Sequence, residues 1–417
     1  MQGLADLLAP VTVEDFFENY WSQKSLLIPG GPEKVAGLFG WEEVNRIFSE
    51  HRLDTSQARL AHEGKSAEDL AFLKSRVSSQ GNRFFEPDIP LLYRLLREGA
   101  SLVLDAVDEM SPSVREFCER VGRDLTCQIS VNAYSTWRTV PGFGVHWDDH
   151  DLFVVQVSGR KHWRLFGKTR PFPLAVDVAE NPAPSEGDVE WEAVISPGDV
   201  IYVPRGHWHG ATGMDEATLH LTCGFSNPTS EDILKWVADQ LKDHELFRQD
   251  VPRFASSAEQ VRYWEEVQRG VAEFLTQASV NDYLNFWKSR NKPRPQFSFP
   301  FIGGDTLHQG TSYRYAGVSQ SELDEIDGKV IFSAAGKKIS VHKTARPVVE
   351  LLLSGEPFQI NDVEKAIAGT MPTEAVAKLL SVLVEHGLAY AVAPRHATSR
   401  GSADETRQSN EDESAAP

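Results

Sequence analysis

Hydrophobic and polar positions divide the chain into helical and β-rich stretches. In the first hundred residues, apolar side chains recur at helical spacing, for example at 13–21 after Thr12 as a candidate cap, which predicts a mainly helical region. From about Ser101, short runs of β-forming residues follow one another between Gly and Pro turns, at 101–104, 128–134, 152–157, 162–166, 199–203 and 217–225. This pattern predicts a small antiparallel barrel or sandwich.

The second half of the chain changes pattern twice. Residues 230–290 carry apolar side chains at helical spacing without such turns, which predicts a bundle of helices. A proline-broken linker at 292–296 is followed by short strands, then by three predicted helices and a strand, at 344–353, 361–368, 373–386 and 387–392. That order suggests a winged helix. No Leu, Ile, Val or aromatic residue occurs from Pro394 onward, so the end of the chain is predicted to be disordered.

Composition narrows the functional classes. The 417 residues are 41% hydrophobic, enough for two or three domains, and no apolar run approaches the roughly 18 residues that span a bilayer. The N-terminus lacks a basic region followed by an apolar one, and three scattered cysteines fit no disulfide framework. We therefore expect a cytoplasmic protein without membrane insertion. The net charge of −18 argues against nucleic acid as the main partner and suits a basic peptide.

Candidate metal ligands lie between residues 128 and 226. His146 and Asp148 are two apart at the edge of a predicted strand, so both are expected on one face. The segment 197–209 adds a strand, a turn and two further imidazoles, His207 and His209. Two His and one carboxylate leave open positions on a metal, as in non-haem Fe(II) oxygenases, and the missing thiolates argue against structural zinc. A His-x-Asp pair alone is also common in ordinary cores and surfaces.

A set of motifs makes the metal site more specific. In order along the chain they are Asn132-Ala133-Tyr134, His146-Trp147-Asp148, Gly159-Arg160-Lys161-His162-Trp163-Arg164, Gly198-Asp199, Pro204-Arg205-Gly206 and Leu219-His220-Leu221-Thr222. The set resembles the JmjC-type cupin family that includes the ribosomal oxygenases, which are Fe(II)- and 2-oxoglutarate-dependent protein hydroxylases. This resemblance implies an α+β fold: a double-stranded β-helix (cupin, or jelly-roll) catalytic domain with a helical segment and a C-terminal winged helix.

The resemblance also implies a domain layout and a quaternary state. A catalytic domain with a helical N-terminal part would occupy residues 1–228, and a helical dimerisation segment would occupy 229–292. A winged-helix-like domain would follow at 293–394, with a disordered tail at 395–417. The protein is therefore expected to form a homodimer.

Carried over by position, the resemblance implies a complete site. His146, Asp148 and His209 would be the iron ligands and catalytic residues, since the family's Pro-x-Gly-x-x-His spacing selects His209 over His207. Lys161 would pair with the distal carboxylate of 2-oxoglutarate, and the cosubstrate pocket would also contain Asn132, Tyr134 and Thr222. The cofactors would be Fe(II), 2-oxoglutarate and O2.

The sequence itself offers one check on this site and several competing residues. Lys161 alternates with Trp163 and Leu165, so it would point into the barrel, where an ammonium needs an anion. The alternative is an exposed turn lysine. Among the others, His150 is expected beside the site or exposed, His162 and His220 are expected to be structural, and Asp149 and Asp151 are expected to be solvated loop carboxylates.

Three functional hypotheses follow. The first is hydroxylation of a protein side chain, with a ribosomal protein as substrate. The second keeps this chemistry but acts on a ribosomally made natural-product precursor peptide, because the loop at 135–141 departs from the family pattern. The third is a non-catalytic winged-helix cupin that acts as a binding or regulatory module.

Overall fold

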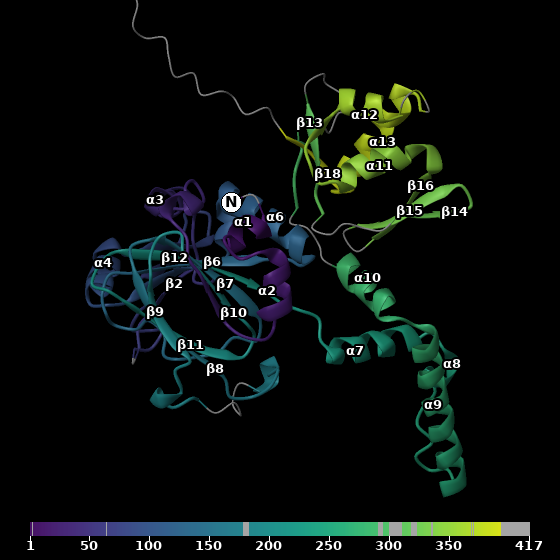
Figure 1. Ribbon diagram of the computed structural model, residues 1–417, viewed down its shortest axis with the longest axis horizontal. Helices are drawn as coiled ribbons and strands as arrows, with labels where there is room; N and C mark the ends of the chain where they lie inside the picture. The colour runs from purple at the N-terminus through teal and green to yellow at the C-terminus, as the bar shows by residue number, and fades with distance from the viewer. Residues whose placement is uncertain are drawn as a thin grey trace, which may run out of the picture. The chain divides into compact units, whose positions relative to one another are not determined.

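The structure, a computed structural model, describes residues 1–392 except 2, 64, 178–182, 291–294, 300–310, 318–322, 335–336, 368 and 370. The chain divides into two compact units, one made mainly of residues 1–293 and the other mainly of residues 294–417 (Figure 1). The predicted disordered tail, 395–417, lies outside the described residues, as does most of the predicted linker at 292–296.

Two antiparallel sheets form the barrel of the first unit. The larger sheet has the strand order β1 (Leu26–Ile28), β10 (Val200–Val203), β7 (Asp151–Ser158), β12 (Thr218–Phe225), β6 (Ser130–Thr136), β5 (Ser101–Leu104) and β2 (Ala58–Ala61). The smaller has the order β11 (His207–Gly213), β8 (Lys161–Lys168) and β9 (Trp191–Ile195). Buried side chains of both sheets share one cluster: Leu152, Val154, Trp163, Leu165, Ile195, Ile201 and Val203. The arrangement confirms the predicted double-stranded β-helix.

Strand β7 is apolar along most of its length because both of its faces are buried. Leu152 and Val154 contribute to the barrel cluster. Phe153 and Val155 point the other way, into a second cluster with the helices α1 (Leu4–Leu8), α2 (Val13–Asn19) and α6 (Pro112–Leu125). The helices therefore cover the outer face of β7, and its inner face lines the interior of the barrel.

The prediction of a mainly helical N-terminal region was wrong in part. Helices α3 (Trp41–Glu50) and α4 (Ile89–Arg97) join α1 and α2, but the region also holds β1, β2 and the hairpin β3 (Leu73–Val77) with β4 (Arg83–Pro87). Strands β1 and β2 are held by pairing with β10 and β5, far away in the sequence. A strand of three or four residues is too short to show a recognisable alternation of apolar and polar positions, so its spacing did not predict it.

The helical segment after the barrel is confirmed. It consists of α7 (Ser230–Leu241), α8 (Glu245–Arg248), α9 (Ser257–Gln277) and α10 (Val280–Arg290). Capping boxes, formed by Thr229 with Asp232 and by Ser256 with Glu259, begin α7 and α9. The helices share a cluster centred on Trp236, Val237, Leu241 and Tyr283. Within the described residues, no helix is both long enough and apolar enough to cross a bilayer.

In the residues that the structure describes, the part of the chain after residue 294 forms two small sheets and three α-helices. One sheet has the order β17 (Phe358–Gln359), β13 (Ser312–Tyr315) and β18 (Ala389–Val392), and the other β14 (Asp324–Ile326), β15 (Lys329–Ala334) and β16 (Lys337–His342). The helices are α11 (Arg346–Leu353), α12 (Ile360–Ile367) and α13 (Thr373–Glu385). They lie where the sequence predicted helices, while the assignment as a winged helix stays a prediction.

The structure also describes several short helices elsewhere in the chain. They are α5 (Val107–Met110), η1 (Pro32–Val35), η2 (Ala175–Asp177), η3 (Glu186–Asp188) and η5 (Lys343–Ala345).

Candidate functional site

Three predicted metal ligands meet at one edge of the barrel. His146 and Asp148 lie in the loop between β6 and β7, not on a strand edge as the sequence predicted, and His209 lies on β11. His146 forms an isolated backbone bridge with His209: its N–H donates to the His209 carbonyl at 3.0 Å and its carbonyl accepts from the His209 N–H at 2.8 Å. This reciprocal pair of bonds holds the two histidine backbones together.

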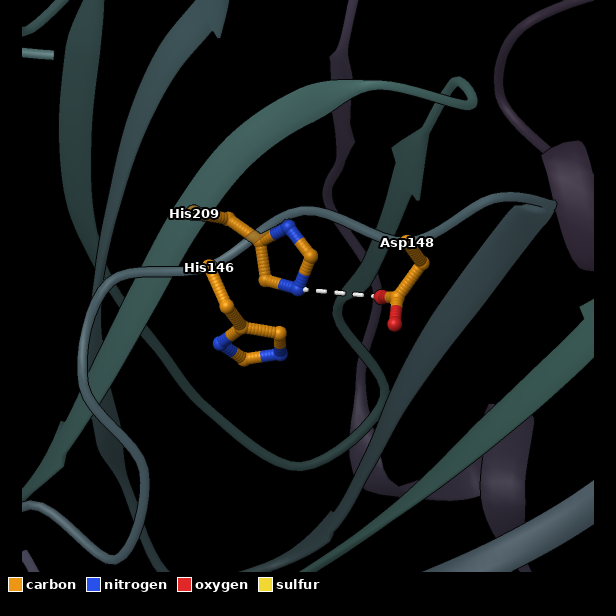
Figure 2. Close-up of side chains that lie close together, drawn as sticks. All are labelled: His146, Asp148 and His209. Carbon is orange, nitrogen blue, oxygen red and sulfur yellow. Dashed lines mark ion pairs between the residues drawn. The ribbon is translucent and has the colours of Figure 1, made fainter. Parts of the chain in front are cut away.

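The side chains of this triad converge. One ligand atom from each of His146, Asp148 and His209 lies within 4.8 Å of the other two. Nε2 of His209 is 3.4 Å from Oδ2 of Asp148, and Figure 2 shows both imidazoles beside the carboxylate. The spacing suits three groups that share one ion rather than three independent surface residues.

Backbone contacts favour the tautomer that a metal needs. Nδ1 of His146 lies 2.9 Å from the Gly144 carbonyl, and Nδ1 of His209 lies 3.0 Å from the His207 carbonyl. A carbonyl can only accept, so each ring donates from Nδ1–H, and the neutral form of this tautomer has its lone pair on Nε2. Burial and the neighbouring His146 lower the pKa of His209, although Asp148 opposes this, so the neutral form of His209 is favoured. Two imidazoles that offer Nε2 and one carboxylate fit Fe(II).

Lys161 is a buried ammonium in the wall of the same cavity. The side chain begins strand β8 and is 6% exposed, as its alternation with Trp163 and Leu165 predicted. Burial lowers the pKa of Lys161 to about 8. Within the described part of the chain, no carboxylate pairs with its Nζ. A buried cation without an anion is costly, so this position favours a bound anionic group.

The predicted cosubstrate residues lie together on two neighbouring strands. Asn132 of β6 is opposite Thr222 of β12, Tyr134 is opposite His220, and all four line the cavity. Oδ1 of Asn132 accepts from the Ala106 N–H at 2.9 Å, which fixes its amide. Tyr134 stacks on His220 with ring centroids 5.1 Å apart, and burial raises the pKa of its phenol. The phenol therefore remains a hydrogen-bond donor.

The cavity has a volume of about 760 Å³. Two of the residues that line it were not predicted from the sequence. Arg59 of β2 lines it, pairs with Asp105 at 2.9 Å and lies over the ring of Phe143. Trp287 of α10 lines it as well. Trp287 lies in a stretch that the sequence predicted only to be helical, and no local motif marks Arg59. Both reach the cavity through tertiary packing.

His209 enters the triad, and His207 does not. His207 is opposite Lys168 and Trp208 opposite Gly167, but His209 is opposite Leu165, so the pairing of β11 with β8 shifts between Trp208 and His209. Phe166 of β8 is the extra residue of this bulge. His207 is buried outside the cavity, and burial lowers its pKa to about 4.

The other candidate residues have mixed outcomes. His150 lines the cavity outside the triad, with Nδ1 3.0 Å from Oδ1 of Asp149, and His162 lies beside Glu192. Asp149 is exposed as expected. The interpretation of Asp151 as a solvated loop carboxylate was wrong: it begins β7, is 3% exposed and accepts three hydrogen bonds.

Comparison with known proteins supports the same assignment. The family model described as "JmjC domain" matches residues 108–233. The chain is 28% identical over 223 residues to the bifunctional lysine-specific demethylase and histidyl-hydroxylase NO66 of Drosophila willistoni, which covers 52% of this chain and 28% of that protein. It is also 28% identical over 220 residues to ribosomal oxygenase 1 of Gallus gallus, which covers 52% of this chain and 35% of the relative. The chain thus spans about a third of the length of these relatives or less.

A solved structure extends the similarity of fold. The ribosomal oxygenase YcfD of Escherichia coli matches with a TM-score of 0.56 at 18% identity, over 92% of this chain and 99% of that one. Another structure of YcfD, in complex with cobalt and 2-oxoglutarate, matches with a TM-score of 0.55 at 19% identity. Fold, triad and domain match agree: residues 108–233 match the JmjC domain, and the fold of the chain is similar to that of a ribosomal oxygenase.

Proposed function

We propose that this chain is an Fe(II)- and 2-oxoglutarate-dependent oxygenase that hydroxylates a side chain of a protein. One observation carries the proposal: the triad of His146, Asp148 and His209 shares a cavity with the buried Lys161, which pairs with no carboxylate among the residues that the structure describes. A ferrous site accounts for the triad, and a cosubstrate carboxylate accounts for the lysine. An ordinary buried core would need neither.

The chain's own residues would hold and orient the reactants. His146, Asp148 and His209 would bind the iron through three ligands and leave the remaining positions to other groups. Bound ferrous iron with 2-oxoglutarate and O2 supplies an oxidant that inserts one oxygen atom into a C–H bond, with succinate and CO2 as coproducts. Lys161 would receive the distal carboxylate of 2-oxoglutarate, and Asn132, Tyr134 and Thr222 would donate hydrogen bonds around it.

A ribosomal protein is the substrate that we propose. The names of the relatives point to ribosomal oxygenases, and the net charge of −18 suits a basic target. Candidate fragments of ribosomal proteins, incubated with the protein, Fe(II), ascorbate, 2-oxoglutarate and ¹⁸O₂, should gain one labelled oxygen atom in the mass spectrum. An identical incubation under nitrogen is the control.

The same experiment distinguishes the other readings. Loss of a methylene mass would favour demethylation, which the name of one relative includes. A gain of oxygen only on a peptide encoded beside the gene would favour tailoring of a natural-product precursor. If no substrate leads to succinate formation, the chain is a non-catalytic binding module.

The binding of 2-oxoglutarate is predicted to weaken at alkaline pH. Burial lowers the pKa of Lys161 in the free site to about 8, and the dicarboxylate binds the protonated form. Affinity should therefore be full below about pH 8 and fall by up to about tenfold per pH unit above it. Titration calorimetry on the cobalt-loaded protein measures this, with Lys161→Arg, which stays charged, as the control. A flat wild-type profile would remove Lys161 from the binding site.

We also propose that the helical segment mediates a homodimer. In helix α9 and the turn before it, Phe254, Val261 and Trp264 expose most of their side chains, and α9 has no buried residue. Such exposed apolar side chains mark interaction surfaces. Trp264→Glu is expected to turn the dimer into a monomer in size-exclusion chromatography with light scattering. Arg262→Glu, two residues earlier and on the far side of the helix, controls for the added charge; a dimer in both variants would refute this interface.

The remaining predicted assignments complete the proposal. Residues 1–228 would form the catalytic domain, 229–292 the dimerisation segment and 293–394 the winged-helix domain. Support comes from the division of the chain near residue 293 and from the order of α11, α12, α13 and β18. A cytoplasmic location is supported by the composition alone.

A further inference from the structure

The first unit contains a buried carboxylate that the proposed chemistry does not use. Asp151 begins β7, three residues after Asp148, and is 3% exposed. Its Oδ2 accepts from the Tyr202 hydroxyl at 2.7 Å and from Nδ2 of Asn227 at 3.0 Å, while Oδ1 accepts from the Arg205 N–H at 2.8 Å. Burial raises the pKa of Asp151, and these hydrogen bonds oppose that rise.

The donors of Asp151 belong to segments that surround the triad. Arg205 lies in the turn between β10 and β11, and the next residue, Gly206, donates its N–H to the carbonyl of Asp148 at 2.9 Å. Gly206 has a φ of 81°, a conformation that few other residues adopt. Asp151 therefore holds the turn that contacts the backbone of one ligand and leads into β11, the strand of another.

The same carboxylate is tied to the N-terminal segment. The Tyr202 hydroxyl that donates to Asp151 also accepts from the Ser22 N–H at 2.9 Å. A carboxylate taken out of water is costly, and apolar packing would fill the space without that cost. The three hydrogen bonds of Asp151 instead hold β7 to β10, to the turn at Arg205 and to the segment at Asn227.

We propose that Asp151 is a positioning residue that sets the spacing between Asp148 and His209, and with it the affinity of the triad for its metal. The inference rests on the metal site of the proposed function. Asp151 contacts no triad side chain; it acts through the backbone of Arg205 and Gly206. Loss of an outer partner that bonds a ligand directly typically costs 10- to 100-fold in metal affinity, and because Asp151 acts through one further segment we expect the lower end of that range, a loss of up to about tenfold.

Cobalt binding to the full chain tests this role. Asp151→Asn keeps the size of the side chain but turns one acceptor into a donor that faces another N–H or O–H. The Kd for Co(II) by titration calorimetry should rise by up to about tenfold, and the absorption spectrum of the cobalt-saturated protein should change. If Asp151 only stabilised the fold, its replacement by asparagine would lower the melting temperature and leave both the Kd for Co(II) and the absorption spectrum unchanged.

Asp199 provides the matched control. It is another carboxylate of the barrel that accepts two backbone N–H bonds, from Gly30 at 2.9 Å and from Ser196 at 2.8 Å. None of these partners belongs to a loop that carries a ligand. Asp199→Asn is expected to lower the melting temperature while the Kd for Co(II) stays at the wild-type value. An equal loss of affinity in both variants would overturn the proposal.

A milder variant keeps the test decisive if Asp151→Asn fails to fold. Asn227→Ala removes one of the three donors and is expected to raise the Kd for Co(II) severalfold. A folded variant with unchanged Kd and spectrum would refute the inference while leaving the metal site intact. Failure of the wild-type protein to bind Co(II) would instead contradict the proposed function itself.

Discussion

Replacing Asp148 by alanine is expected to abolish metal binding and turnover. The variant leaves two imidazoles without the only anionic ligand of the triad, so no ligand charge offsets that of Fe(II). Because loss of an outer partner alone costs 10- to 100-fold, loss of this ligand should raise the Kd for Fe(II) by more than about 100-fold. Anaerobic titration calorimetry measures the Kd, and succinate formation measures turnover.

Asp149 supplies the control for this experiment. It is the same residue type in the same loop, but its side chain is exposed and lies outside the triad. Asp149→Ala should retain the wild-type Kd for Fe(II). Full turnover by Asp148→Ala, or an equal loss in the two variants, would show that the ligand assignment is wrong.

Replacing Lys161 by methionine should mainly weaken the binding of 2-oxoglutarate. A buried carboxylate that loses its ammonium partner costs about 2 to 4 kcal/mol, or roughly a 30- to 1,000-fold rise in Kd. The affinity for the metal should stay the same because Lys161 is not part of the triad. The variant without ligands should be at least as stable as the ligand-free wild type, since methionine removes a buried charge that no carboxylate of the described residues balances.

Lys168 lies at the other end of strand β8 and tests whether any lysine of that strand would give this result. Its side chain is exposed and lies over the ring of Phe172. Lys168→Met is expected to bind 2-oxoglutarate like wild type. If Lys161→Met also binds it with unchanged Kd, another group must hold the distal carboxylate.

Features that depend on one strand or one helix were predictable from the sequence. The alternation of Lys161 with Trp163 and Leu165 predicted that the lysine faces the interior, and all three are buried. The helices of 230–290 were predictable from their apolar spacing and the lack of Gly and Pro turns. In each case the residues that decide the outcome lie within a few positions of one another.

Features that depend on distant segments were not predictable in this way. Spacing alone would put His207 and His209 on one face of a strand, yet His209 lies in the triad and lines the cavity, and His207 is buried outside it. Strands β1 and β2 exist because β10 and β5 pair with them. Asp151 is of a residue type that is common in exposed loops, but it is buried because Tyr202 and Asn227 converge on it.

Diffraction at the manganese absorption edge tests the central claim most directly. In crystals grown with Mn(II) and 2-oxoglutarate, we expect a single anomalous peak per chain between Nε2 of His146, the carboxylate of Asp148 and Nε2 of His209. Density for the dicarboxylate should run from that peak to Nζ of Lys161. A peak elsewhere, or a dicarboxylate bound away from both the triad and Lys161, would contradict the account.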